Sequence, residues 1–106
     1  MRLPGSIGEL LAQAQRIQQT VAETQAELEK RRIEGSAGGS MVNVVADGTM
    51  RLLSVRIDPA LAQAGDAEML QDLVCAAVND ALGKAKEQLK AEFSRFAGGL
   101  SIPGLG

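Results

Sequence analysis

The feature that most constrains the fold is a long amphipathic segment from Asp66 to Phe96. It contains no proline and a single interior glycine, Gly83. Asp66 stands where its carboxylate can cap the first turn of a helix, and the pair Gly98-Gly99 is expected to end it. Apolar side chains recur at intervals of three and four residues, the spacing of one helix face: Leu70, Leu73, Val74, Ala77, Val78, Ala81, Leu82, Ala85, Leu89, Phe93 and Phe96.

The predicted helix is too long to be enclosed by one small globule. At about 1.5 Å per residue it would reach about 45 Å. A compact chain of 106 residues has a radius of gyration of only about 13 Å. We therefore expect this helix to project from the fold or to lie against a partner chain.

A second helix is predicted from about Glu9 to Arg31, after an irregular start from Arg2 to Gly8. A narrow apolar seam of this kind is marginal when a helix stands alone. We expect it to pack on another helix, either the long C-terminal one or a second copy of itself. The seam positions alternate spacings of four and three residues, as in a coiled coil: Leu10, Ala14, Ile17, Val21, Thr24 and Leu28.

The middle of the chain has the pattern of a β-hairpin. Met41 to Ala46 is rich in β-branched residues and roughly alternating, and Met50 to Ile57 is the return strand, with Leu53, Val55 and Ile57 on one face. Asp47-Gly48 between them predicts a tight two-residue turn with positive φ at both positions. So few strands need a helix layer on one face, and this predicts an α+β fold.

The segments around the hairpin complete the predicted layout. Arg32 to Glu34 is a candidate short strand, Gly35 to Ser40 a flexible connection, and Asp58-Pro59 a stop before a linker over residues 60–65. Residues 1–96 form one predicted domain. Residues 97–106 are predicted to be a flexible glycine-rich tail. The alternative for the tail is a tether that docks on the body or on a partner.

Composition argues against several classes of function. The chain has 13 acidic side chains and 11 lysines and arginines. It therefore lacks the excess of positive charge that is typical of nucleic-acid-binding proteins. It has no His, Trp or Tyr, which removes imidazole chemistry, His-ligated metal sites and most base-stacking platforms. We expect no enzyme activity, cofactor, metal or small-molecule substrate, and no membrane span, because no apolar run is long enough.

The long helix contains two polar positions that are candidates for chemistry, Cys75 and Asn79-Asp80. The single cysteine, Cys75, cannot form an internal disulfide, which fits a reducing cytoplasm. We expect it to be a small buried hydrophobe rather than a reactive thiol. Asn79-Asp80 could suggest a polar site, but a helix cap or a dimer-interface hydrogen bond is the favoured interpretation, because no nucleophile or base accompanies it.

The order of elements resembles the YbaB/EbfC family of nucleoid-associated proteins. The matching stretches are QAQRIQQTVAETQAELE, GGSMVNVVADG, VRIDP followed by EMLQDLVCAAVNDALGKA, and the ending GGLSIPGLG. The resemblance covers nearly the whole chain. It implies a cytoplasmic, nucleoid-associated bacterial homodimer whose sheets form the body and whose helices extend like the arms of tweezers. It also implies binding of double-stranded DNA with little sequence preference, which would alter DNA conformation, nucleoid organisation or gene expression.

Candidate DNA contacts lie mainly in the second half of the long helix. Lys84 and Arg95 fall on one edge of its apolar face, and Lys86 and Lys90 fall near the opposite edge. Basic residues there could instead complement the helix dipole or mark a solvated face. The resemblance favours DNA contact, because the helical arms are the part of these proteins that contacts DNA.

The first helix departs from the family pattern, whose members commonly carry several lysines there. Only Arg16 sits mid-helix, and it shares a face with Glu9, Glu23 and Glu27. An acidic stripe would repel phosphate. Arg2 and the trio Lys30-Arg31-Arg32 could contribute to DNA binding. Alternatively, the trio interacts with the negative end of the helix dipole and with the neighbouring Glu27 and Glu29. DNA binding is therefore predicted to be weak or to need a bent or specific target. The alternative function is a dimeric protein-interaction module with little or no DNA binding.

Overall fold

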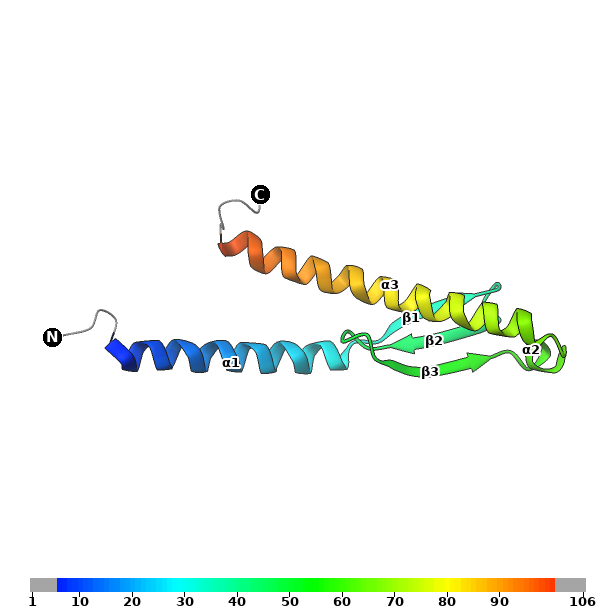
Figure 1. Cartoon of the computed structure of the whole chain (residues 1–106), viewed down its shortest axis with the longest axis horizontal. Coiled ribbons are helices and arrows are strands. Elements are labelled where there is room, and N and C mark those ends of the chain that lie inside the picture. Colours follow the sequence, from blue (N-terminus) through cyan, green and yellow to red (C-terminus); the bar gives the residue numbers. More distant parts are fainter. Residues whose placement is uncertain (1–5, 101–106) are drawn as a thin grey trace.

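The computed structural model describes the backbone of residues 6–100 and the side chains of residues 6–95. It is an elongated α+β structure with extents of 77 × 27 × 17 Å. Two long helices project from one end of a small sheet (Figure 1). The elements in chain order are α1 (Ser6–Lys30), β1 (Ile33–Ala37), β2 (Val42–Ala46), β3 (Leu52–Ile57), α2 (Pro59–Gln63) and α3 (Ala67–Leu100).

The three strands form one antiparallel sheet in the order β1-β2-β3. The first half of α3 lies along β1 and β2, which leaves β3 as an edge strand outside the helix layer (Figure 1). The core between helix and sheet consists of small and β-branched side chains: Val42, Val44, Ala46, Leu61, Ala77 and Ala81. The second half of α3 passes beyond the sheet, so the predicted projection of this helix is confirmed, and the radius of gyration is 21.0 Å.

β1 is longer than predicted. It continues through Gly35 to Ala37, so the prediction of a flexible connection is wrong for residues 35–37. α3 lies so close to β1 that a Cβ on Gly35 would come within 2.4 Å of the backbone nitrogen of Ala81. Ala77, Ala81 and Ala85 are fully buried along the same helix face. Glycine opposite alanine therefore sets the distance between helix and strand.

The hairpin between β2 and β3 is confirmed, but the predicted turn is wrong. The backbone N–H of Met50 donates to the Asp47 carbonyl at 3.1 Å, and that of Asp47 donates to the Arg51 carbonyl at 2.9 Å. Met50, rather than Asp47 or Gly48, adopts positive φ, at 68°. This is a three-residue loop with a left-handed third residue. The register also shifts, so that Leu52 rather than Leu53 pairs with Ala46.

Position 48 requires a glycine because the hairpin loop lies against the C-terminal end of α1. Its N–H donates to the carbonyl of Leu28 at 2.8 Å, which caps the C-terminal end of α1. A Cβ at Gly48 would lie 2.8 Å from that same carbonyl oxygen. Leu28 is buried against this turn. The hairpin loop thus anchors the end of α1 to the sheet.

The remainder of α1 has no helix packed over its seam within the described chain. Of the six seam positions only Leu28 is buried, and Leu10, Ile17 and Val21 are each more than 60% exposed. The expectation that the seam packs on the long C-terminal helix is therefore not met in the single chain. The seam remains open to a second copy or another partner.

The ends of the helices give mixed outcomes. Asp66 caps α3 as predicted, because its carboxylate accepts from the backbone N–H of Met69 at 3.0 Å. The expected end at Gly98-Gly99 is wrong, because α3 continues to Leu100. The predicted linker over residues 60–65 contains α2, which Asp58 caps by accepting from the Ala60 N–H at 2.8 Å. The predicted irregular start is wrong for residues 6–8, because α1 begins at Ser6. Residues 1–5 of that start and residues 101–106 of the predicted tail lie outside the described part.

Candidate nucleic-acid interface

Lys84 is engaged within its own subunit. Its Nζ lies 3.2 Å from Asp80 Oδ2 and 3.2 Å from the backbone oxygen of Glu34 in β1. Asp80 also accepts from the backbone N–H of Ser36 at 3.0 Å. These bonds tie α3 to the outer strand of the sheet. Asp80 is therefore not a helix cap, and Lys84 is paired with this acid although its side chain is 55% exposed.

Arg95 is likewise paired. Its Nη2 lies 3.0 Å from Glu92 Oε1, and the same carboxylate oxygen forms an ion pair with Nη2 of Arg31, which follows α1. Arg31 and Glu92 are 61 residues apart in the sequence. The sequence offered Arg31 only as one of three cations at a helix end, and no local pattern could have indicated its partner.

The carboxylates beside these cations stay ionised at neutral pH. The Ser36 N–H, then the Lys84 ammonium, hold the pKa of Asp80 below its ordinary value. The hydrogen bond from Arg31 is the main cause of the lowered pKa of Glu92. Each acid thus offsets a neighbouring positive charge at the pH of the cell.

Lys86 and Lys90 are the lysines of α3 that remain available. Both are exposed, and neither forms an ion pair with a described side chain. They are four residues apart, so they lie on one side of the helix, one turn from each other. This side belongs to the half of α3 that extends past the sheet. Of the four predicted α3 contacts, these two are the freest to meet an external anion.

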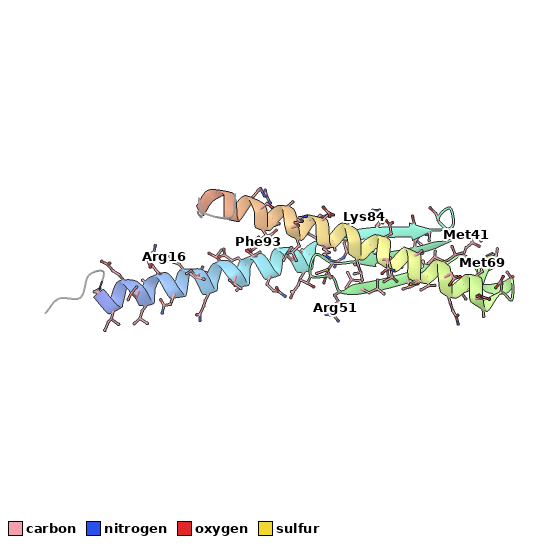
Figure 2. The ribbon with its side chains drawn as sticks, turned by 45° about the horizontal axis from the view of Figure 1, so that its top comes forward. Arg16, Met41, Arg51, Met69, Lys84 and Phe93 are labelled. Carbon is pink, nitrogen blue, oxygen red and sulfur yellow. The ribbon has the colours of Figure 1, made fainter. Side chains whose placement is uncertain are left out.

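Arg16 lies apart from these lysines, on the solvent-exposed stretch of α1 (Figure 2). It borders a groove of about 480 Å³ between α1 and the distal half of α3. The walls are largely apolar, and Phe93 on the α3 side is 70% exposed. The groove is lined by Arg16, Ile17, Thr20, Val21, Thr24, Gln25, Leu28, Leu89, Glu92 and Phe93.

The five predicted site residues therefore do not form one cluster. Lys84 lies over the sheet and Arg16 lies on the other helical arm (Figure 2). Lys86 and Lys90 lie further along α3. Arg95 pairs with Glu92, the same carboxylate that Arg31 contacts from the end of α1. Such a distribution suits contacts to an extended polyanion better than a pocket for a small ligand.

Two further exposed arginines, Arg51 and Arg56, are not among the predicted site residues. Arg51 ends the hairpin loop, and Arg56 lies on β3 opposite Asn43. Both are exposed and form no ion pair with the described side chains. The alternation of residues along β3 could have indicated that Arg56 is exposed, because it places Arg56 on the face opposite Leu53, Val55 and Ile57.

Cys75 is exposed, so the prediction of a buried position is wrong. Its sulfur accepts a long hydrogen bond of 3.6 Å from the Asn79 side chain one turn later. Among the described side chains, no three His, Cys, Asp or Glu residues are arranged to hold a metal ion. No helix within residues 6–100 is both long and apolar enough to cross a bilayer.

Comparison with known proteins decides the family. The model of the YbaB/EbfC DNA-binding family matches residues 4–100. The chain belongs to that family. A nucleoid-associated protein of Acetivibrio thermocellus is 47% identical over 95% of this chain and 90% of its own length. One from Thermoanaerobacter sp. (strain X514) is 43% identical over 94% of this chain and 90% of its own.

A solved structure supports the fold of this family member. The crystal structure of an uncharacterized protein from Helicobacter pylori superimposes with a TM-score of 0.76 and covers 87% of this chain and 97% of the other. The two sequences are 21% identical, so the match concerns the fold. This structure confirms the predicted fold. The family resemblance inferred from the VRIDP block and the long helix is confirmed by the family match over residues 4–100.

Proposed function

We propose that this protein is a homodimeric nucleoid-associated protein that binds double-stranded DNA with little sequence preference. Its binding would alter DNA conformation and nucleoid organisation in the cytoplasm, with effects on gene expression. The observation that carries the proposal is the pair of exposed, unpaired lysines, Lys86 and Lys90, on a projecting helix of a chain from a DNA-binding family. Arg16, Lys84 and Arg95 are the remaining proposed contacts.

Non-specific affinity of this kind comes mostly from phosphate contacts and counterion release. The chain has no Trp or Tyr, so stacking on bases can contribute little. Side chains on two separate arms can follow a backbone without reading base edges. The ion pairs of Lys84 and Arg95 and the acidic residues of α1 keep the positive charge modest. We therefore expect weak binding per subunit and a need for two subunits acting together.

Support for the dimer comes from apolar surface that one chain leaves uncovered. β3 is an edge strand, and unpaired edges invite pairing with another chain. The seam of α1 is also open. Contiguous exposed apolar surface usually marks an interaction site. The exposed apolar side chains on and beside β3 are Met50, Leu52, Leu53, Val55 and Ile57.

The deciding experiment is binding to a random-sequence duplex, measured by fluorescence anisotropy as salt is raised from low to physiological concentration. We expect log affinity to fall linearly with log salt, with a slope of about −0.9 for each phosphate contact. A duplex of different sequence and equal length is the control and should bind with similar affinity. Absence of binding at low salt would overturn the proposal.

The groove between α1 and α3 favours a second candidate function, protein binding. Its apolar walls, with Ile17, Val21 and Phe93 exposed, suit an amphipathic helix of another protein better than a phosphate backbone. This candidate predicts that Phe93→Ser, on the α3 wall of the groove and outside the α1 seam, abolishes capture of a stoichiometric partner from nuclease-treated extract while DNA binding is unchanged. Failure of the wild-type protein to capture such a partner would count against it.

A further inference from the structure

Two arginines from distant parts of the chain converge on one carboxylate. Arg31 follows the last residue of α1, and Arg95 lies one helical turn after Glu92 in α3. Glu92 Oε1 is paired with Nη2 of Arg31 and lies 3.0 Å from Nη2 of Arg95. Two guanidinium groups thus share a single anionic oxygen at the junction of the arms.

This cluster is open to solvent. The side chains of Arg31 and Glu92 are 33% and 28% exposed, and that of Arg95 is 76% exposed. A guanidinium group binds carboxylates and phosphates through the same planar array of donors. The carboxylate of Glu92 therefore lies where a phosphate oxygen from solution could be received by the same two arginines.

We propose that Arg31 and Arg95 form a phosphate-binding site for the DNA backbone and that Glu92 fills this site in the free protein. A phosphodiester then binds by replacing Glu92 as the partner of the two guanidinium groups. This inference rests on the proposed DNA-binding function and adds to it a residue, Arg31, together with a carboxylate that limits affinity.

The exchange has a consequence for the arms. The Arg31–Glu92 ion pair links the base of α1 directly to α3, while the other anchors of α1, Leu28 and Gly48, join it to the hairpin loop. Glu92 also borders the groove between the two helices. Replacing its bond to Arg31 by a bond to phosphate removes this link, so α1 can adjust its direction relative to α3 when DNA binds.

The test compares Glu92→Gln with Glu87→Gln in the duplex-binding assay. Both variants remove one negative charge from α3, but Glu87 is exposed and has no ion pair with a described side chain. We expect Glu92→Gln to bind about threefold to fivefold more tightly than Glu87→Gln, the range that a partly exposed ion pair can account for. Its salt slope should be steeper by about one contact.

A second pair of variants tests the arginine. Arg31→Gln should bind DNA more weakly than Arg32→Gln, because the Arg32 side chain is engaged with backbone oxygens of Glu29 and Arg31 at 2.9 Å. The gain from Glu92→Gln should also disappear when Arg31→Gln and Arg95→Gln are added. Circular dichroism at the assay temperature establishes that each variant is folded.

The outcomes separate the inference from the function on which it rests. If wild type binds DNA with a salt-dependent affinity but Glu92→Gln is no tighter than Glu87→Gln, the inference is wrong and DNA binding stands. An equal effect of Arg31→Gln and Arg32→Gln would likewise overturn it. If no form of the protein binds DNA at low salt, both proposals fail together.

Discussion

At the scale of single residues, Gly35 and Gly48 are glycines because a larger side chain would not fit, and not because their backbone needs positive φ. Gly35 faces the backbone of α3 and Gly48 faces the carbonyl that ends α1. Neither has positive φ, whereas Met50 and Ser40 do. A glycine in a turn signal can therefore be required by a neighbour distant in sequence, and Asp47-Gly48 is such a case.

We predict that Gly35→Ala destabilises the protein strongly. The added methyl would lie 2.4 Å from the Ala81 nitrogen and 2.5 Å from the Ala77 oxygen, and backbone atoms of a packed helix cannot move aside easily. Overpacking of this kind costs about 1–3 kcal/mol or more. Urea unfolding at fixed protein concentration measures the effect.

The matched control is Gly83→Ala, because a Cβ at Gly83 meets nothing within 4 Å and the residue lies inside α3. It should leave stability unchanged or raise it by up to about 1 kcal/mol through helix propensity. An unchanged urea midpoint for Gly35→Ala would show that helix and strand are not held as closely as described.

We also predict that stability falls in acid through Asp80. Its pKa is below the ordinary value of 3.8 because it accepts from Ser36 and Lys84. A carboxylate with a lowered native pKa stabilises the fold above its unfolded-state pKa, and that stabilisation is lost as pH falls through the native value. The wild-type urea midpoint should therefore decline below about pH 5.

Asp80→Asn tests that assignment against Asp72→Asn, which changes an exposed carboxylate of the same helix that has no hydrogen bond among the described residues. Asp80→Asn should lower the urea midpoint at neutral pH, and its difference from wild type should shrink in acid. A difference that stays constant from neutral pH into acid would exclude the proposed role of Asp80.

At the scale of elements, α3 combines two roles along its length. Its first half packs alanines on the sheet, and its second half extends past the sheet (Figure 2). Lys86 and Lys90 in that second half are exposed. Ion pairs with Asp80 and Glu92 bracket the stretch that holds Lys86 and Lys90. The helix therefore has a structural half and a half in which net positive charge is concentrated on a few side chains.

We predict that single substitutions of the α3 lysines have unequal effects on DNA binding. Lys86→Ala and Lys90→Ala should each weaken affinity and reduce the magnitude of the salt slope by about one. Lys84→Ala is the control, since the Lys84 ammonium is already bonded to Asp80 and to the Glu34 carbonyl, and it should change affinity least. Equal losses from all three would contradict this ranking.

At the scale of the whole molecule, the elongated shape is the basis of the proposed dimer. The chain is 77 Å long and only 17 Å thick, with an uncovered edge strand and an uncovered helical seam. Pairing two chains through the sheet would bury apolar surface at the body and leave two pairs of arms free. Such an arrangement would let one dimer contact a duplex at two places.

We predict that the wild-type protein sediments as a dimer at micromolar concentration and that Val55→Lys shifts it towards monomer. Val55 lies on β3 opposite Val44 and is 40% exposed in the single chain. Ser54→Lys introduces the same charge on the neighbouring residue of the opposite face and should leave more of the dimer intact. A monomeric wild type would refute the dimer, and equal effects of both substitutions would argue against an interface on the Val55 face.

The sequence by itself determined the elements whose signals are local. A three- and four-residue spacing with Asp66 at its start was sufficient for α3, and alternation of β-branched residues was sufficient for β2 and β3, because such patterns are complete within one segment. The motif block around Ile57-Asp58-Pro59 was sufficient for the family.

The tertiary structure alone decided which residues meet. Gly35 pairs with Val44 in the sheet and lies directly under α3, Lys84 is bonded to the Glu34 carbonyl because β1 lies beside it, and Arg31 reaches Glu92 across 61 residues. Each outcome depends on the distance between elements, which packing sets and no short window of sequence encodes. The charge that this protein can present to DNA is for that reason a property of its fold more than of its composition.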